Sequence, residues 1–390
     1  MTLASRKWLA SAILLCAGVS AEAKVSFALD FSLDSQGGLF DASTTDGQTA
    51  RATMTRAAQV FSDRLLDNLT AITPSGSNTW TPTIVNPATG ANRTPAFTGG
   101  VGANVIKVFV GSGPLNATEV GMAYAGTATR DGTQAFKDNA DSRGQGGALT
   151  TPKTDYGPWG GSIAFDWSTD WNLALTTGGL TPNKVDLYTV ALHELIHLLG
   201  FSGTQPSYAN LVVGTAFTGL NAKAANGGLV APSVNGSHWL GMSSTVGASG
   251  PAQVALMDAS LPTGVRRRVT LLDWAALDDV GWTLAPLGDA DANGVVGFTD
   301  YQAMQRGWGK SNASWAVGDF NEDGVVNVAD FHILYDNMGL RADGTLSPTA
   351  AEDRAAVASA AAAMGIEVPE PGLGGATIVG FALVLLRRRR

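Results

Sequence analysis

The sequence predicts an α+β domain followed by a small helical module, and three observations support this. Residues 25–31 alternate between apolar and polar as in a strand, and residues 105–110, 120–125 and 162–167 are further predicted strands. Apolar residues recur at helical spacing at residues 51–69 and again in the stretch that ends at Gly200. An acidic 12-residue pattern that begins at Asp289 is repeated from Asp319, where the composition of the chain also changes.

The first 23 residues have the pattern of an export signal. Arg6-Lys7 precedes an apolar run from Trp8 to Val19, and Ala21-Glu22-Ala23 resembles a cleavage site. The alternative is an N-terminal membrane anchor, for which the run is short. Cys16 is the single cysteine of the chain and lies in this segment. The mature chain is therefore expected to have no disulfide, thiol nucleophile or cysteine metal site.

Residues 24–285 are predicted to form the main domain. Residues 72–103 are rich in Thr, Pro, Gly and Asn, and residues 130–155 are polar and glycine-rich, so both segments are expected to be loops. The basic triplet 266–268 is expected to be a solvated patch, with a processing site as the alternative. A helix is predicted to begin after Thr270, which has capping-box spacing to Asp273, and to stop at Gly281.

The chemistry-bearing pattern of this domain is HELIH at residues 193–197. The preceding Thr181-Pro182 is expected to start the helix. On a helix, His193 and His197 project from one face, one turn apart, with Glu194 beside the first. Two imidazoles on a rigid rod and a nearby carboxylate suit a zinc hydrolase. The alternative is a chance match, in which the histidines are solvated or hydrogen-bonded.

A zinc site of this kind needs a third protein ligand. The chain has 4 histidines, and no glutamate occurs between Glu194 and Glu322. Gly203 stands where a compact HExxHxxGxxH motif would have its third histidine. Since His332 belongs to the acidic module, His238 is the predicted third ligand and Asp258 is a weaker substitute.

HELIHLLGF at residues 193–201, the distant His238-Trp239 and the later Leu-Met-Asp at residues 256–258 resemble the leishmanolysin-like branch of the metzincin zinc endopeptidases. The resemblance implies a twisted mixed sheet backed by two helices, the active-site helix among them, and then a C-terminal subdomain. It implies one catalytic zinc ion held by His193, His197 and His238. Glu194 would be the general base and Met257 the residue of the Met-turn. The sequence departs from the pattern because no tyrosine electrophile follows Met257.

Residues 286–342 are predicted to form a calcium-binding module. Two segments have the same pattern, Asp289–Asp300 and Asp319–Asp330. Each has oxygen ligands at positions 1, 3, 5 and 12, glycine at position 6 and a backbone carbonyl at position 7. This is the pattern of an EF-hand calcium loop, with Asp at position 12. Two calcium ions are therefore expected. The ligands would be Asp289, Asp291, Asn293, Val295 and Asp300 in loop 1, and Asp319, Asn321, Asp323, Val325 and Asp330 in loop 2.

Each loop is followed by a short helical segment, 301–305 and 331–337, and the pair resembles a type I dockerin. The resemblance implies a cohesin-like or cell-surface partner. Loop positions 10 and 11, which help recognise cohesin in that family, are Phe298-Thr299 and Val328-Ala329 here.

The C-terminal part is predicted to be an alanine-rich helical spacer at residues 343–367 and a tail at residues 368–390. The tail consists of Val368-Pro-Glu-Pro, an apolar run from Leu373 to Leu386 and the arginines 387–390. It resembles the PEP-CTERM sorting signal, which implies transient membrane anchoring and processing by an exosortase. The alternative is a permanent C-terminal transmembrane anchor.

Together these patterns predict an exported zinc metalloendopeptidase, secreted or at the cell surface, that hydrolyses protein or peptide substrates by metal-activated water. The alternative is a non-catalytic adhesion or scaffold protein with a structural zinc site. The 48 glycines and the low charged fraction of 15% suit a loop-rich secreted protein. The net charge of −8 argues against a nucleic-acid partner.

Overall fold

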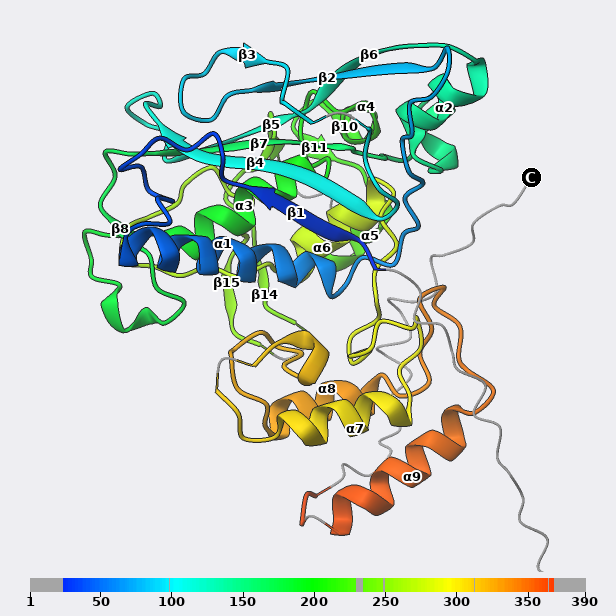
Figure 1. The fold of residues 1–390 in the computed structure, drawn as a ribbon. Helices are drawn as coiled ribbons and strands as arrows, with labels where there is room; N and C mark the ends of the chain where they lie inside the picture. The colour runs from blue at the N-terminus through cyan, green and yellow to red at the C-terminus, as the bar shows by residue number, and fades with distance from the viewer. Residues whose placement is uncertain are drawn as a thin grey trace, which may run out of the picture.

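A four-stranded mixed sheet organises the N-terminal domain, which was predicted at residues 24–285 (Figure 1). The computed structural model describes residues 24–97, 99–228, 234–247, 250–311, 313–363 and 365–367. The predicted signal peptide and sorting tail lie outside these described residues. The α+β class predicted from the sequence is confirmed.

The sheet has the order β1-β4-β7-β5. Its strands are β1 (Ser26–Asp30), β4 (Val105–Gly113), β7 (Gly160–Asp166) and β5 (Gly121–Ala125). The first three are parallel, and β5 runs antiparallel to β7 at one end of the sheet. Side chains of β4 alternate between two apolar clusters, with Val108 and Val110 in one and Phe109 in the other. Apolar layers therefore lie on both faces of the sheet.

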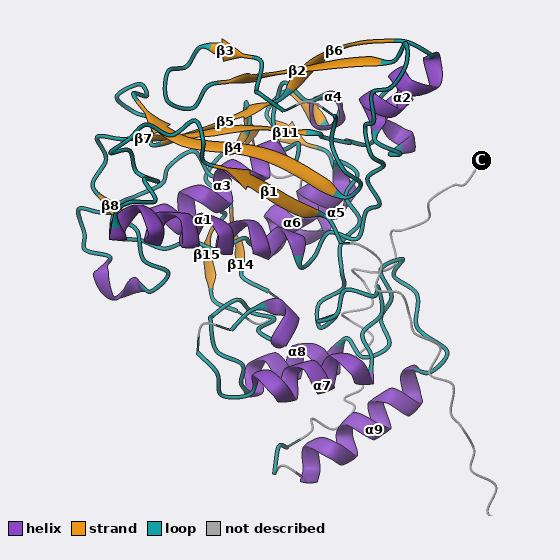
Figure 2. Ribbon diagram, in the orientation of Figure 1, coloured by secondary structure: helices purple, strands orange, loops and turns teal. Residues whose placement is uncertain are grey.

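Helices α1 (Thr45–Ser62) and α3 (Leu187–Leu198) pack together on one face of this sheet (Figure 2). Thr44 caps α1, since its side chain accepts a hydrogen bond from the backbone N–H of Gly47. The predicted range 51–69 is too late, because the helix ends at Ser62. Leu65 and Leu69 are buried in the irregular segment that follows. Apolar spacing alone cannot distinguish such a buried segment from another helical turn.

The other face is covered by a small second sheet, in the order β3-β2-β6 (Figure 1). It consists of β3 (Asn92–Arg93), β2 (Thr79–Val85) and β6 (Thr127–Asp131). The prediction of a loop at 72–103 is therefore wrong: β2 alternates exposed threonines with inward-facing Trp80 and Ile84. The predicted loop 130–155 also contains α2 (Gln134–Ser142), which is capped by Thr133.

Short elements make up the remainder of the N-terminal domain. Helix α6 (Leu271–Asp279) has the predicted capping box between Thr270 and Asp273. The others are β8 (Trp171–Asn172), β9 (Val185–Asp186), α4 (Pro206–Ala209), β10 (Val212–Val213), β11 (Ala216–Phe217), α5 (Leu220–Ala225), β12 (Val234–Asn235), β13 (His238–Trp239), β14 (Ser243–Thr245), β15 (Ala252–Val254) and the 3-10 turns Gly146–Leu149 and Thr177–Gly179.

The C-terminal module has its own apolar cluster. Its helices are α7 (Phe298–Gly307), α8 (Val328–Asp336) and α9 (Ala350–Ala363), and a 3-10 turn covers Trp315–Val317. The residues predicted to be a spacer form α9, which buries Val357 and Ala361 in this cluster. No helix in the described part of the chain is long and apolar enough to cross a membrane.

Candidate functional site

Three imidazoles converge beside helix α3. The Nε2 atoms of His193 and His197 are 3.2 Å apart, and His238 brings its Nε2 to 3.2 Å from His193 and 3.3 Å from His197. Tetrahedral zinc with Zn–N bonds of about 2.0–2.1 Å requires nitrogen ligands about 3.3–3.4 Å from one another. The spacing of this histidine triad therefore fits a zinc ion.

Backbone carbonyls fix the two helical imidazoles. Nδ1 of His193 lies 2.9 Å from the carbonyl oxygen of Leu256, and Nδ1 of His197 lies 2.7 Å from that of Phe201. A carbonyl oxygen only accepts, so each Nδ1 must carry the proton and each Nε2 presents a lone pair to the centre of the triad. This is the tautomer that a metal ligand needs.

Burial keeps the triad neutral. Burial first and the neighbouring imidazoles second lower the pKa of His193 well below its usual value and that of His197 to about 4. The pKa of His238 is also lowered, with burial as the main cause. Neutral imidazoles bind a metal without first losing a proton.

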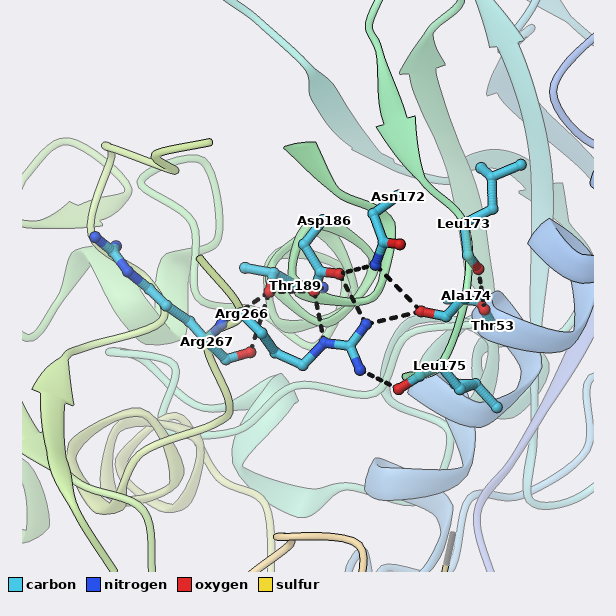
Figure 3. Close-up of polar contacts among 9 residues, drawn as sticks. All are labelled: Thr53, Asn172, Leu173, Ala174, Leu175, Asp186, Thr189, Arg266 and Arg267. Carbon is cyan, nitrogen blue, oxygen red and sulfur yellow. Dashed lines mark hydrogen bonds and ion pairs between the residues drawn. The ribbon is translucent and has the colours of Figure 1, made fainter. Parts of the chain in front are cut away.

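Asp186 holds the start of α3, and Figure 3 shows its contacts. Its Oδ2 accepts from the N–H of Thr189 at 3.1 Å, and Asn172 donates to Oδ1 at 2.9 Å. Arg266 forms a two-point ion pair with it, at 2.9 Å and 2.7 Å, and also donates to the carbonyl oxygens of Ala174 and Leu175. The cap therefore connects helix α3 to two distant segments.

Two sequence expectations are corrected by this cluster. The helix begins after Asp186 and not at Thr181-Pro182, because Asp186 provides the cap. The basic triplet is not a solvated patch: the side chain of Arg266 is 10% exposed, and Arg267 is buried with its guanidinium donating to Ser260. The predicted stop at Gly200 is confirmed by its φ of +107°.

Glu194 is buried between α3 and strand β5. The backbone N–H of Ala123 donates to its carboxylate, and a Cβ built on Gly121 would lie 2.8 Å from its Oε1. Burial raises the pKa of Glu194 to about 8. A divalent cation at the triad would favour the ionised form and lower this pKa. The arrangement places the carboxyl group of the residue that follows His193 against strand β5 at the sheet edge.

A buried carboxylate that sequence analysis treated only as a helix cap also supports the triad. Asp273 accepts from Nε1 of Trp239 at 2.9 Å and from the N–H groups of Leu256 and Met257 at 3.0 Å and 3.1 Å. Leu256 provides the carbonyl that orients His193, and Trp239 follows the third histidine. The capping-box spacing of Asp273 was visible in the sequence. Its hydrogen bonds to the turn at Leu256 and Met257 become visible only in the folded structure.

Met257 is fully buried in that turn, and its carbonyl accepts from the N–H of Trp239 at 2.8 Å. The substitute ligand Asp258 lies next to it but has a different task. Its Oδ2 accepts from Gly241 at 3.0 Å and its Oδ1 from Ser260, so its carboxylate shapes the turn. Among the described residues, the group that could hold a metal at this place is the three histidines.

The acidic loops fold as their spacing predicts. In loop 1, Asp289, Asp291 and Asp300 bring carboxylate oxygens within 4.8 Å of one another. In loop 2, Asp330 accepts from the N–H groups of Phe320 and Asn321 at 2.8 Å and 3.2 Å, which closes the loop. The other predicted ligands line the same turns. These are Asp291, Asn293 and Val295 in loop 1 and Asn321, Asp323 and Val325 in loop 2. His332 lies on α8 and is not part of either cluster.

Both loops fit a cation. Oδ1 of Asp319 is buried without a hydrogen-bond partner, as expected for an atom reserved for a ligand. Burial and the neighbouring carboxylates raise the pKa of Asp289 to about 8 and that of Asp319 to about 7. Calcium, with its preference for oxygen ligands, would relieve this repulsion.

Comparison with known proteins identifies the second unit. Residues 287–340 match the family model of the dockerin type I domain. Searches of curated proteins and of solved structures returned no match. Dockerin domains bind calcium, which supports the prediction of calcium in both loops. The chain thus carries a dockerin type I domain at residues 287–340, attached to an α+β domain with a histidine triad.

Proposed function

We propose that the N-terminal domain is a zinc-dependent endopeptidase of metzincin-like type. The observation that carries the proposal is the histidine triad, whose Nε2 atoms lie 3.2–3.3 Å apart with Glu194 on the same helix. These donors are neutral, fixed in the required tautomer and correctly spaced for zinc. When bound, zinc supplies Lewis-acid polarisation of the scissile carbonyl and of water.

The residues of the chain would divide the remaining work. The three imidazoles orient the metal, and Glu194 accepts the proton of the attacking water and passes it to the leaving amine. Burial raises the pKa of Glu194, and a raised pKa suits a carboxyl group that must both accept and donate a proton. No covalent intermediate with the protein is required.

Strand β5 is the proposed substrate-binding edge. It lies at the end of the sheet, pairs with β7 alone among the described strands, and contacts α3. An extended peptide could add to this edge and place a carbonyl near Glu194, which already contacts Ala123 of β5. The sequence predicted such an edge without identifying the strand.

The test combines metal analysis with casein cleavage by the purified chain. Glu194→Gln should keep one zinc per chain and lose about 10²- to 10⁴-fold in activity, as expected when a general base is removed. Glu352→Gln, which changes an exposed carboxylate on α9, is the matched control and should retain full activity. His238→Ala should lose zinc, and full zinc occupancy in that variant would reject the proposed ligand set.

The competing function is a non-catalytic adhesion or scaffold protein with structural zinc. Zinc bound by both wild type and Glu194→Gln, with no cleavage by either, would favour it. The dockerin domain is compatible with both functions, since it provides attachment to a partner.

For the dockerin domain we propose a cohesin-like partner that binds at the starts of α7 and α8. Thr299 is exposed there and Val328 is 44% exposed, so both loop positions are accessible. Val328→Asp should abolish binding of a purified cohesin that recognises the wild type.

Export, exosortase processing and a secreted or cell-surface location remain part of the proposal, and they rest on the sequence of residues 1–23 and 368–390.

A further inference from the structure

A buried arginine joins the N-terminal domain to the dockerin domain. Arg64 follows α1 and is 5% exposed. Its guanidinium carbon lies 4.2 Å from the ring centre of Trp274 in α6 and 4.5 Å from that of Trp315 in the dockerin domain. Cations stacked on indole rings are attracted to them, more strongly when desolvated. One side chain therefore bonds to both units.

Glu322 of loop 2 faces the same place. Its Oε2 is buried without a hydrogen-bond partner, and its charge is attracted to those of Arg64, Arg268 and Arg56. Arg56 also donates to the carbonyl oxygen of Ala313 in the dockerin domain. The acid at this position of loop 2 is thus attracted by three cations of the N-terminal domain and repelled by Asp63, without a direct ion pair among the described residues.

Loop 1 provides an internal comparison for this acid. Position 4 is Glu322 in loop 2 and Ala292 in loop 1, and both adopt a left-handed backbone, with φ of 57° and 52°. The loop conformation therefore does not require a carboxylate at position 4. The feature that distinguishes Glu322 from Ala292 is the attraction of its carboxylate to Arg64, Arg268 and Arg56.

Loop 2 also contacts the hairpin formed by β14 and β15, which links the third histidine to the Met257 turn (Figure 1). At its tip, a Cβ built on Gly247 would lie 3.4 Å from the carbonyl oxygen of Phe320 and 3.6 Å from Cα of Asn321. At its base, the N–H of Ala255 donates to the carbonyl of Met242 at 2.9 Å. The hairpin thus runs from a calcium-loop residue to the zinc-site turn.

We propose that loop 2 is docked on the N-terminal domain and that calcium binding to it stabilises the β14–β15 hairpin and the segment around Arg64. Calcium orders the backbone from Asp319 to Asp330, and this segment carries Glu322 and the surface that meets Gly247. A ligand that binds the ordered loop more tightly stabilises every contact that depends on that order. The partner of this face of the dockerin domain is its own chain. The proposal does not depend on proteolytic activity.

The docking leaves the cohesin-recognition positions accessible. Val328 is 44% exposed and Thr299 is exposed in the docked arrangement. Docking in cis and binding of a partner in trans therefore use different residues of the same small domain.

Hydrogen exchange of the full mature chain, with calcium ions as the only added ligand and magnesium as the comparison, tests the proposal. Calcium at about 100 times its dissociation constant should slow exchange in β14, β15 and residues 62–67 by between about 10- and 100-fold, the upper value corresponding to complete coupling. Glu322→Gln, which removes the charge and keeps the shape, should lose most of this protection. Glu352→Gln should keep it.

Three results would overturn the proposal. One is calcium protection of residues 289–300 and 319–330 with no change in β14, β15 or residues 62–67 of the wild type. A second is full protection of β14 and β15 in Glu322→Gln. If that variant does not fold, the wild-type comparison with and without calcium decides alone, and absence of calcium binding would equally refute the coupling.

Discussion

Replacing Asp273 by asparagine tests how the turn at Leu256 and Met257, beside the histidine triad, is held. This carboxylate is fully buried and accepts five hydrogen bonds, from Trp239, Leu256 and Met257 and two from Thr270. Asparagine has the same shape but replaces one acceptor oxygen by a donor. The variant therefore changes the bonding and leaves the packing intact.

The magnitude follows from which oxygen is replaced. Oδ1 accepts from Nε1 of Trp239 and the N–H of Met257, whereas Oδ2 accepts from the N–H groups of Leu256 and Thr270 and from the Thr270 hydroxyl. In either orientation of the amide, at least two buried N–H groups lose their acceptor. At about 1–3 kcal/mol for each, the free energy of unfolding should fall by roughly 2–6 kcal/mol.

The same change should weaken zinc binding. Leu256 provides the carbonyl for Nδ1 of His193, and groups that orient metal ligands typically contribute about 10- to 100-fold in affinity. Urea denaturation of the metal-free chain and zinc titration against a competing chelator measure the two effects. Asp46→Asn, an exposed change in the first turn of α1, is the control. Equal stability and equal zinc affinity in the two variants would refute the reasoning.

Three further predictions concern other buried charges. Arg266→Ala should lower the free energy of unfolding by about 3–5 kcal/mol, because it leaves the fully buried Asp186 unpaired; urea denaturation unaffected by the change would contradict this. Burial raises the pKa of Asp67 to about 7 from the usual 3.8, so the folded state binds its proton more tightly. Stability should therefore decrease as pH rises from about 4 to 7, by at most about 4 kcal/mol, and Asp67→Asn should remove this part of the dependence; identical pH profiles would exclude it. Asp319→Asn should reduce bound calcium from two ions to one in native mass spectrometry, and two retained ions would reject loop 2 as a site.

The sequence predicted those features that depend on local spacing. The capping box of α6, the stop at Gly200 and the acidic loops follow from residues close together in the chain, and each is present in the structure. The prediction of His238 as the third ligand was an exception. It did not rest on local spacing but on the elimination of the few other candidate ligands in the chain. Its Nε2 lies 3.2 Å from that of His193, across 45 residues of sequence.

Features that depend on tertiary contacts were missed. Arg266 and Arg267 look like a solvated triplet in the sequence, since nothing local indicates that Asp186 and the Ser260 carbonyl will receive them. Strand β2 was not predicted, because its threonines and Pro82 are typical of a loop. Its pairing with β6, a tertiary contact, makes it a strand. Such residues acquire their roles from partners far away in the chain.

Two buried aspartates show how the fold converts helix caps into supports for the site. Asp186 caps α3 and pairs with Arg266, while Asp273 completes the capping box that Thr270 begins at α6 and holds the turn at Met257. Capping a helix uses only part of the hydrogen-bonding capacity of a carboxylate. In these two aspartates the remaining oxygen lone pairs accept from distant residues, whereas in an exposed cap they would accept from water. Since Arg266 and Asp273 flank one short segment, its position relative to α3 is fixed from both ends. Through Trp239, which follows His238, and Leu256, which orients His193, Asp273 also contacts neighbours of two of the three histidines, and such supporting contacts hold a metal site in place.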